Sequence, residues 1–289
     1  MATSVSAAFD ELHGRLTPLK TEVDAASRHR ASVEAALKAA FGLNRFFQSG
    51  SWGNGTSVRI WSDVDYFASL PHELQAHGSS KVLELVCDAL DRRFATTPVR
   101  VDPPAVLVGF GASGSERYEV VPSFICDTSD PDAFVYEIAS PGGGWMTASP
   151  EGQHRAVARE DQRLKSRLRP MIRFIKAWKY WNSVPISSFY LETWAVAYAK
   201  HTDLIVPKID LGIYFDCVHA GRLGSIPSLI GDGVVASGAD AADRSSVLES
   251  LLTARVIAEL AWEAEKADDV ALAFRYWDRL FDGRFPARG

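Results

Sequence analysis

The sequence predicts an α+β fold with two lobes, in which a mixed β-sheet lobe precedes a helical C-terminal lobe. Short aromatic and β-branched segments, typical of strands, are concentrated between residues 45 and 125. From residue 154 onward, apolar residues recur at helical spacing instead. A stretch rich in Pro, Gly and Ser at residues 140–152 reads as a loop that separates the two patterns. We therefore expect one domain over residues 1–150 and a second over residues 151–289.

The first domain is expected to begin with two helices. Residues 4–41 are rich in Ala, Leu, Glu and Arg at helical spacing. Pro18 breaks or kinks this run, so a short helix should be followed by a long one. Gly42 is a suitable stop for the long helix because glycine readily adopts the left-handed backbone that ends helices.

Strand-like segments follow these helices. Residues 45–50 (RFFQSG) and 64–70 (VDYFASL) are short and aromatic, and residues 79–94 predict an amphipathic helix. Residues 105–111 (AVLVGFG) and 117–125 (RYEVVPSFI) flank a Gly/Ser turn at residues 112–115, which is typical of a hairpin. The order of these elements indicates a mixed sheet with helical packing.

The second domain is expected to be helical. Helical spacing of apolar residues extends over residues 156–179, 188–202, 245–267 and 271–280. Gly-rich stretches near residues 221–238 interrupt the pattern. A helical lobe of this kind is expected to close an active-site cleft.

Overall charge and composition exclude several classes of protein. The net charge is -5, whereas proteins that grip duplex nucleic acid usually carry a basic excess, so small-molecule substrates are favoured. The three cysteines are scattered without a Cys-x-x-Cys spacing, which argues against a zinc site or a disulfide framework. Neither a signal-peptide pattern nor an apolar run of membrane-spanning length is present. We expect a cytoplasmic protein with no membrane partner.

One glycine motif does not indicate a dinucleotide-binding site. Gly109, Gly111 and Gly114 spell G-x-G-x-x-G, but a dinucleotide fingerprint needs a helix directly after the glycines. A second strand follows here, so a hairpin turn is the better interpretation. The phosphate-binding sequence G-x-x-x-x-G-K-[ST] is also missing.

The segment FFQSGSWGNGTSVRIWSDVDYF carries the strongest chemical signal. Asp63 and Asp65 alternate with Val64, so on a strand both carboxylates project to one face while Val64 enters the core. Two carboxylates on one face repel each other unless a cation lies between them. A pair of divalent ions serves this purpose in phosphoryl and nucleotidyl transfer, and Mg²⁺ suits hard oxygen ligands.

Neighbouring residues complete the proposed pattern. Glu119 is a third acid in an otherwise β-branched and aromatic strand. Gly50 allows the backbone to approach a ligand closely, and Ser51 can offer its hydroxyl and N–H to a triphosphate. The structural alternative is a tight turn followed by a polar edge strand. Three acids together with a Gly-Ser corner favour the metal site.

Two features of the second domain could bind a ligand, but each also has an ordinary structural explanation. Lys176 and Lys179 share a helix face, which would also be typical of a solvated basic surface. The serines at 187 and 188 precede a helical segment, so they could act as an N-cap instead of binding a ligand.

These motifs resemble a known superfamily. GSWGNGTSVRIWSDVDYF resembles the Gly-Ser and D-x-D signature of DNA-polymerase-β-like nucleotidyltransferases, and RYEVVPSF is similar to their third-acid strand. RPMIRFIKAWKYWN and PISSFYLETW resemble the helical-lobe motifs of the oligoadenylate synthase and cyclic GMP–AMP synthase branch. GGGWMTASPEGQH resembles a loop of its bacterial members, the cGAS/DncV-like enzymes (CD-NTases) of CBASS antiphage systems. The resemblance covers about residues 40–200.

The resemblance implies a two-lobed polymerase-β-like nucleotidyltransferase with a two-metal site. Asp63, Asp65 and Glu119 would hold two Mg²⁺ ions, for which Mn²⁺ can substitute. Glu119 would also accept the proton of the attacking hydroxyl. This sequence has Glu at a position where many relatives have Asp, which could shift the metal slightly.

The resemblance also implies contacts to the substrate. Gly50 and Ser51 would contact the donor triphosphate, together with Lys176 and Ser188, and Phe189 would stack on a base. The substrates would be ATP and GTP, with UTP or CTP as further candidates. The cysteine-histidine zinc insertion of animal cyclic GMP–AMP synthase is missing, so activation by double-stranded DNA is not expected.

The expected activity is synthesis of a cyclic di- or trinucleotide second messenger with release of pyrophosphate. The product would act on a separate effector protein in antiphage defence. One alternative is an enzyme of the same superfamily that transfers a nucleotide to an RNA, a protein or an antibiotic. Another is an inactive nucleotide-binding or antitoxin-like module.

Overall fold

The computed structural model describes residues 2–111, 116–130, 133–231 and 233–289. Contacts divide the chain into two compact units. The helical unit consists of Met1–Thr17, Thr56–Trp61 and Ala156–Gly289, and the sheet unit consists of Pro18–Gly55 and Ser62–Arg155. The chain thus passes between the units four times. Two segments that the sequence-based division assigned to the first domain, residues 1–17 and 56–61, cluster with the helical unit.

The two N-terminal helices agree with the sequence prediction. Helix α1 is Val5–Leu16 and α2 is Lys20–Phe41, on either side of Pro18. The hydroxyl of Ser4 caps α1 by accepting from the N–H of Ala7, at 3.2 Å. Gly42 ends α2 with a positive φ of 73°.

The sheet unit contains a seven-stranded mixed sheet in the order β1-β2-β5-β4-β3, with β6 pairing β5 and β7 pairing β6. The parallel pair is β2 with β5, and the other neighbouring pairs are antiparallel. The strands are β1 (Arg45–Gln48), β2 (Val64–Ser69), β3 (Val99–Asp102), β4 (Ala105–Phe110), β5 (Glu116–Asp127), β6 (Val135–Ala139) and β7 (Trp145–Ala148).

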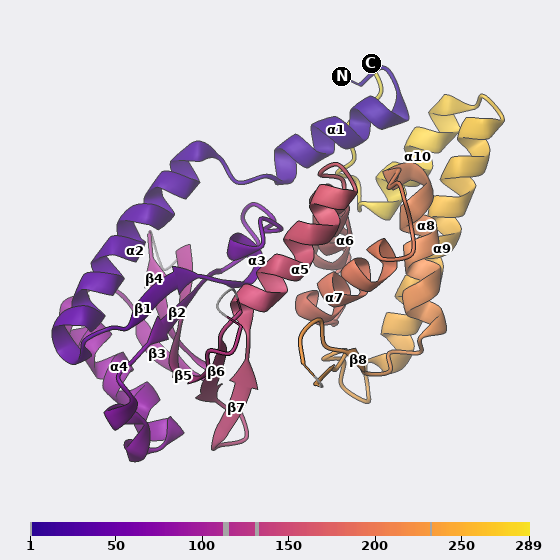
Figure 1. Ribbon diagram of the computed structural model, residues 1–289. Helices are drawn as coiled ribbons and strands as arrows, with labels where there is room; N and C mark the ends of the chain where they lie inside the picture. The colour runs from indigo at the N-terminus through magenta and orange to yellow at the C-terminus, as the bar shows by residue number, and fades with distance from the viewer. Residues whose placement is uncertain (1, 112–115, 131–132, 232) are drawn as a thin grey trace. The chain divides into compact units, whose positions relative to one another are not determined.

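Helices cover one face of this sheet. Helix α2 and helix α4 (Ser79–Arg93) pack on the face that carries Val64 and Tyr66, and these side chains form one core cluster (Figure 1). The opposite face carries a smaller cluster that includes Phe67, Val121 and Tyr136. Two short helical segments, α3 (Gly50–Gly53) and η1 (His72–His77), complete this unit.

Several predictions about the sheet unit were incomplete or wrong. Strands β3 and β6 were missed, and the segment 140–152, expected to be a loop, contains β7 and the start of helix α5 (Pro150–Arg163). Strand β7 is stabilised by pairing with β6, a contact that local composition does not encode. The expected hairpin turn at residues 112–115, with Gly114, lies outside the described residues, but β4 and β5 on either side of it are antiparallel neighbours.

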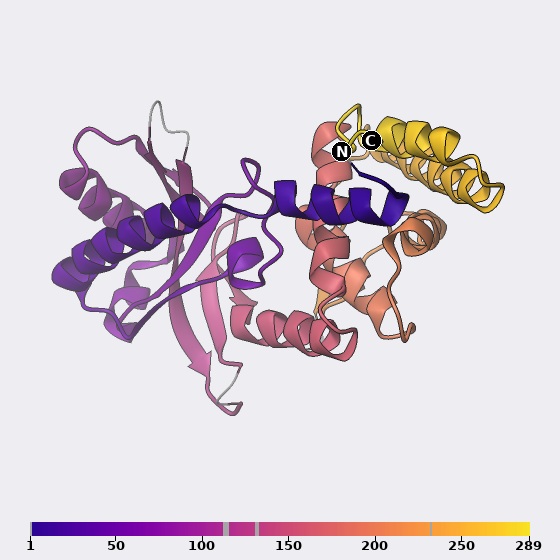
Figure 2. The same cartoon turned by 90° about the horizontal axis from the view of Figure 1, so that it is seen from above.

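The helical unit contains most of the remaining helices. Helices α9 and α10 lie side by side, and α8 packs against α9 (Figure 2). The elements are α6 (Leu168–Trp181), α7 (Ser188–Ala199), α8 (Pro207–Ala220), α9 (Arg244–Lys266), α10 (Val270–Leu280) and the short strands β8 (Ile226–Pro227) and β9 (Val234–Val235).

Two helix predictions in this unit need correction. The expected continuous helix at 156–179 is broken between α5 and α6, where Lys165 and Ser166 adopt positive φ angles of 55° and 62°. Helix α8 was not predicted. Several of its sides are covered by other elements, so its polar and apolar residues show little separation into two faces.

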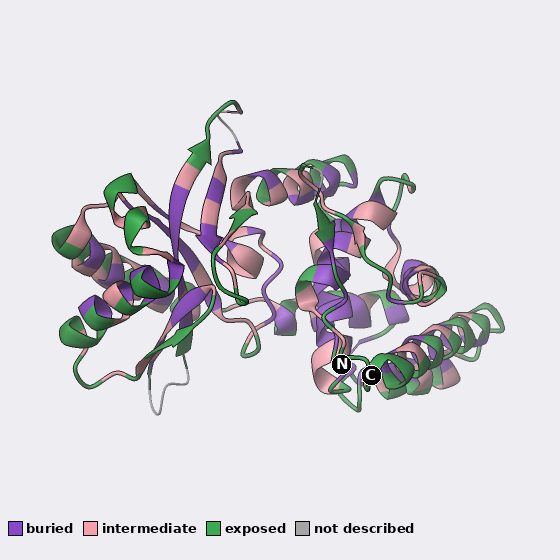
Figure 3. Ribbon diagram, turned by 90° about the horizontal axis from the view of Figure 1, so that it is seen from below, coloured by how far each residue is buried: buried purple, intermediate pink, exposed green. Residues whose placement is uncertain are grey.

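Aromatic residues build the core of the helical unit. Phe9 of α1 makes edge contacts with Phe174 and Trp277, and with Phe285 near the C-terminus. Burial follows the expected pattern: side chains that face this core are buried, and the outward faces of α9 and α10 are exposed (Figure 3). Among the described residues, no helix combines the length and apolar composition needed to cross a bilayer.

Candidate active site

Asp65 and Glu119 are neighbours across the parallel pair of central strands. Strand β2 places Asp65 directly opposite Glu119 of β5, close enough for Asp65 to influence the pKa of Glu119. Val64, next to Asp65, enters the helix-covered core and is buried. The alternation predicted from the sequence is therefore present at Val64 and Asp65, and it brings two acids from distant segments together.

Asp63 immediately precedes β2 and completes the acidic group. Its Oδ1 accepts a hydrogen bond from Nε of Arg117, at 2.9 Å. Arg117 is on β5, two residues before Glu119, so both side chains leave the same face of the strand. The charge of Asp63 also acts on Glu119, so all three carboxylates belong to one electrostatic group.

The protonation equilibria reflect this crowding. Burial raises the pKa of Glu119, and the negative charge of Asp63 raises it further, while the interaction with Asp65 lowers it in part. Burial likewise raises the pKa of Asp63, and the neighbouring Arg117 partly offsets this effect. The folded chain therefore holds carboxylates in surroundings that disfavour their charged forms. A bound cation would stabilise the charged forms of these carboxylates.

The Gly50–Ser51 pair packs directly against the acidic group, at Asp65. Helix α3 begins at Gly50, whose φ of 55° is positive, and a methyl group at that position would overlap the carboxylate of Asp65. The N–H of Ser49 donates to the carbonyl oxygen of Asp65, at 2.9 Å. Only glycine satisfies both the backbone angle and the space at position 50. Ser51 follows it in the first turn of α3.

The chemistry of the three acids fits a divalent metal. Asp63, Asp65 and Glu119 offer hard carboxylate oxygens, the ligand type that Mg²⁺ prefers. In the described part of the chain, no group of three His, Cys, Asp or Glu residues is already gathered closely enough to form a metal site. One oxygen of Asp63 is instead bonded to Arg117. The three carboxylates fit the metal, and one of them, Asp63, is bonded to the guanidinium of Arg117.

Lys176 of α6 is buried in the helical unit. Its ammonium group forms an ion pair with Glu192 of α7, and both side chains are 3% exposed. Lys176 also donates to Oγ1 of Thr56 at 3.1 Å, and that hydroxyl donates to Glu192 at 2.7 Å. The basic solvated surface considered for this helix is therefore not what the structure shows at Lys176.

Lys179, one turn further along α6, forms no ion pair with a carboxylate in the part of the chain that the structure describes. Its Nζ donates to Oγ of Ser188 at 2.9 Å, and the hydroxyl of Tyr180 lies 3.2 Å from the same oxygen. Burial lowers the pKa of Lys179, and the charge of Lys176 lowers it further. Ser187, rather than Ser188, caps α7 by accepting from the N–H of Tyr190. Ser188 is thus held by a lysine rather than by the helix end.

Phe189 follows Ser188 and is 46% exposed, which is unusual for a large aromatic residue. An exposed aromatic ring beside a Lys-Ser pair is compatible with the stacking role that the sequence predicts for it.

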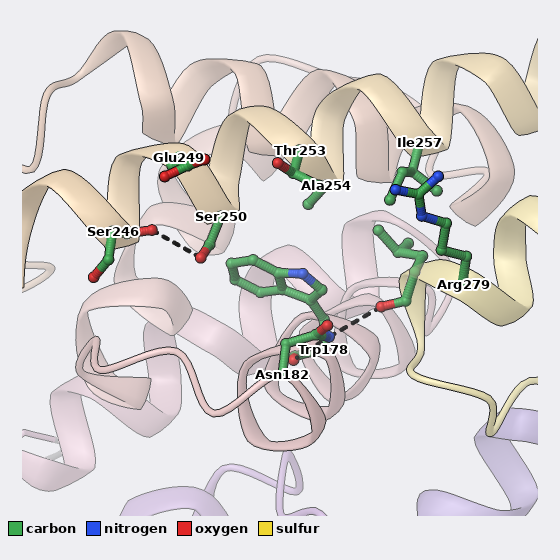
Figure 4. Close-up of a pocket in the computed structure, with 10 residues that line it drawn as sticks. Trp178, Asn182, Ser246, Glu249, Ser250, Thr253, Ala254, Ile257 and Arg279 are labelled. Atoms are coloured by element: carbon green, nitrogen blue, oxygen red, sulfur yellow. Dashed lines mark hydrogen bonds between the residues drawn. The ribbon is translucent and has the colours of Figure 1, made fainter.

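A separate pocket of about 330 Å³ lies within the helical unit, between α6, α9 and α10 (Figure 4). The indole of Trp178 forms part of its lining, and Asn182 donates to the carbonyl oxygens of Trp178 and Leu280 at 2.9 and 3.0 Å. Its two charged residues, Glu249 and Arg279, are exposed. None of the predicted site residues lines this pocket, and we assign it no ligand.

Sequence reasoning missed two charged residues of these clusters. Arg117 stands next to the third-acid strand motif, but a single arginine at a strand start carries no local signal. Glu192 was not among the predicted site residues, whereas it is the buried partner of Lys176. Its position in an otherwise apolar helix was the available signal.

Comparison with known protein families assigns the chain to one of them. Residues 3–160, more than half of its length, match the Second Messenger Oligonucleotide or Dinucleotide Synthetase (SMODS) domain. The chain belongs to the SMODS family. Members of this family are nucleotidyltransferases of the CD-NTase type, as the sequence motifs indicated. A search of curated protein sequences found no match.

Solved structures share the fold of this SMODS protein. E. coli CdnC, in complex with HORMA-deltaN, aligns with a TM-score of 0.74 and 17% identity over 97% of each chain. Vibrio cholerae DncV, a cyclic AMP–GMP synthase solved with a linear intermediate, aligns with a TM-score of 0.77 and 15% identity over 95% of this chain and 94% of that chain. Elizabethkingia meningoseptica CdnE, a cyclic dinucleotide synthase solved with GTP and Apcpp, aligns with a TM-score of 0.62 and 18% identity over 78% and 89%. The predicted polymerase-β-like fold is confirmed.

Proposed function

We propose that this SMODS protein is a metal-dependent nucleotidyltransferase that joins ribonucleoside triphosphates into a cyclic di- or trinucleotide. The product would be a second messenger in antiphage signalling that acts on a separate effector protein. The observation that supports this most strongly is the pairing of Asp65 with Glu119 across β2 and β5, with Asp63 beside them, in a chain of this family.

The proposed reaction is an in-line displacement at phosphorus. The oxygen of a ribose hydroxyl forms a bond to the α-phosphorus of a nucleoside triphosphate while the bond to the bridging oxygen of the β-phosphate breaks, and pyrophosphate leaves. Glu119 would accept the proton of the attacking hydroxyl, since it is the acid of β5 that lies directly opposite Asp65. A second displacement within the linear intermediate would close the ring.

Asp63, Asp65 and Glu119 would hold two Mg²⁺ ions, or Mn²⁺ in their place. Such ions, when bound, lower the pKa of the attacking hydroxyl and neutralise the leaving phosphates. The tight packing of Gly50 against Asp65 would fix that carboxylate in place.

Substrate contacts are proposed for residues of both units. Gly50 and Ser51 would offer backbone N–H groups and a hydroxyl to the donor triphosphate. In the helical unit, Ser188 would contact the triphosphate and Phe189 would stack on a base. Lys176 would need to leave Glu192 to reach a phosphate, so we propose Lys179, already bonded to Ser188, as the lysine that contacts it more readily.

The experiment is incubation of purified protein with all four ribonucleoside triphosphates and Mg²⁺ or Mn²⁺, followed by phosphatase treatment and mass spectrometry. A phosphatase-resistant product with the mass of a cyclic di- or trinucleotide is expected, and its mass gives the base composition. If folded protein forms a product only after an RNA, protein or antibiotic is added, the proposal of a nucleotide-only synthase is wrong. Magnesium-dependent nucleotide binding without turnover in any mixture would indicate an inactive module instead.

A further inference from the structure

Arg117 lies within the acidic group of the sheet unit. Its Nε donates to Asp63 at 2.9 Å, and its side chain projects from the same face of β5 as Glu119. The residue opposite Arg117 on β4 is Gly109, which has no side chain to restrict the guanidinium. The Arg117 side chain is 60% exposed, whereas that of Asp63 is 29% exposed.

This placement is unusual for a surface ion pair. An exposed pair between Arg and Asp contributes little to stability because water screens both charges. Here the carboxylate belongs to an acidic group in which Asp65 and Glu119 lie directly opposite each other on β2 and β5. A permanently charged guanidinium therefore offsets like-charge repulsion that would otherwise remain when no metal is bound.

The same hydrogen bond engages an atom that a metal would need. Oδ1 of Asp63 cannot accept from Arg117 in this geometry and also present the same lone pair to a divalent ion. A guanidinium close to the site also repels an incoming cation. Both effects disfavour metal binding, and both disappear if the side chain of Arg117 moves toward solvent.

We propose that Arg117 sets the affinity of the acidic group for divalent ions by competing with the metal for Asp63. In the metal-free protein Arg117 holds this carboxylate, and binding of the divalent ion exchanges the guanidinium for the ion. The inference rests on the metal site of the proposed function, and Arg117 acts as an affinity-determining residue rather than as a ligand.

The test is a titration with Mn²⁺ alone, without nucleotide, followed by electron paramagnetic resonance of the free ion. Arg117→Gln is expected to bind Mn²⁺ more tightly than the unmodified protein, on the order of five- to tenfold. Arg155→Gln is the matched control, because Arg155 forms an ion pair with Asp130 elsewhere in the sheet unit. Its Mn²⁺ affinity should equal that of the unmodified protein.

A double variant separates competition from a general charge effect. In an Asp63→Asn background, Arg117→Gln should change Mn²⁺ affinity much less, since the contested carboxylate is gone. Unchanged or weaker Mn²⁺ binding by Arg117→Gln, in a protein whose binding still depends on Glu119, would overturn this inference and leave the proposed function standing. If the unmodified protein binds no Mn²⁺, or binds it equally well after Glu119→Gln, both the inference and the metal site are wrong.

Discussion

Two of the three acids, Asp63 and Glu119, lie where burial makes their negative charge unfavourable. Glu119 is partly buried, and its pKa is raised by burial and by Asp63. Gly50 packs so closely on Asp65 that a methyl group at position 50 would overlap this carboxylate. A fold selected for stability alone would not place three acids together in this way, so the cost is a physical reason to assign them a ligand-binding role.

Replacing Glu119 should therefore stabilise the metal-free protein. An acid whose folded-state pKa is raised contributes stability below its unfolded pKa and loses it as pH rises through the folded pKa, so ionised Glu119 is destabilising at pH 7. Glu119→Gln is expected to raise the melting temperature at pH 7 without metal. It should also abolish the stabilisation that Mg²⁺ gives the unmodified protein.

Differential scanning fluorimetry with and without Mg²⁺ measures both effects. Glu84→Gln, which removes an exposed ion pair with Lys81 on α4, is the control and should change neither. A lower melting temperature for Glu119→Gln, together with a retained Mg²⁺ response, would show that Glu119 is a structural residue.

His13 of α1 gives the helical unit a pH dependence. Its Nε2 accepts from Arg173 at 3.0 Å, and it is packed near Phe174, with Thr17 and Asp10 on its own helix. Burial and the charge of Arg173 lower its pKa, and Asp10 opposes this only partly. The unfolded chain thus binds a proton more readily than the folded one as pH falls below about 6.5.

The melting temperature should consequently fall between pH 7 and pH 5 more steeply in the unmodified protein than in His13→Gln, which keeps a hydrogen-bond acceptor but does not titrate. Thermal melts at closely spaced pH values measure the two slopes. Parallel slopes would mean that His13 is free to protonate in the folded state.

At the scale of elements, one short segment is held by polar, apolar and aromatic contacts within the helical unit. Thr56–Trp61 connects α3 to Asp63 and clusters with the helical unit. Arg173 donates to the carbonyl oxygen of Ser57 at 3.0 Å, Val58 is in the helical core, and Trp61 stacks on Tyr180 with centroids 5.2 Å apart. Helices α6 and α7 thereby hold the segment that leads directly into the first acid.

The two lysines of α6 should respond differently to substitution. Lys176→Met removes the positive charge that neutralises the buried carboxylate of Glu192, so we expect a loss of about 3–5 kcal/mol in the free energy of unfolding. Lys179→Ala breaks no ion pair with a described residue, so it should leave stability nearly unchanged. It should raise KM for nucleoside triphosphates several-fold, since it removes a positive charge beside Ser188.

Urea denaturation and steady-state kinetics on both variants provide the measurement. The double variant Lys176→Met with Glu192→Leu should recover much of the lost stability, because it removes both buried charges together. If Lys176→Met is as stable as the unmodified protein, or Lys179→Ala has an unchanged KM, the roles assigned to the two lysines are wrong.

The sequence predicted those elements whose patterns are strong and local. The Pro18 break, the long helix α2, the strand around Asp65 and the amphipathic helix α4 are all present. The break between α5 and α6 was missed because Lys165 and Ser166 adopt left-handed backbone angles that neither residue signals in sequence. Strand β7 depends on its partner β6, which local composition does not encode.

At the scale of the whole molecule, the predictable part was the order of sheet and helices. The separation of aromatic strand segments from helical segments leads to this architecture directly. The discontinuity of the two units could not be predicted, because Thr56 and Ser57 contact residues more than a hundred positions later in the chain. The same limit applies to the candidate site: its acids were recognisable, whereas Arg117 and the Lys176–Glu192 pair depend on long-range contacts.

Metal-dependent nucleotidyl transfer at these carboxylates can be measured as pyrophosphate release from nucleoside triphosphates in the presence of Mg²⁺, compared between the unmodified protein and Asp63→Asn/Asp65→Asn. Circular dichroism and thermal melts establish that the variant is folded. We expect the unmodified protein to release pyrophosphate. In the folded double variant the rate of release should be lower by at least about a thousandfold. Release at the rate of the unmodified protein would contradict the assignment of these carboxylates to metal-dependent nucleotidyl transfer.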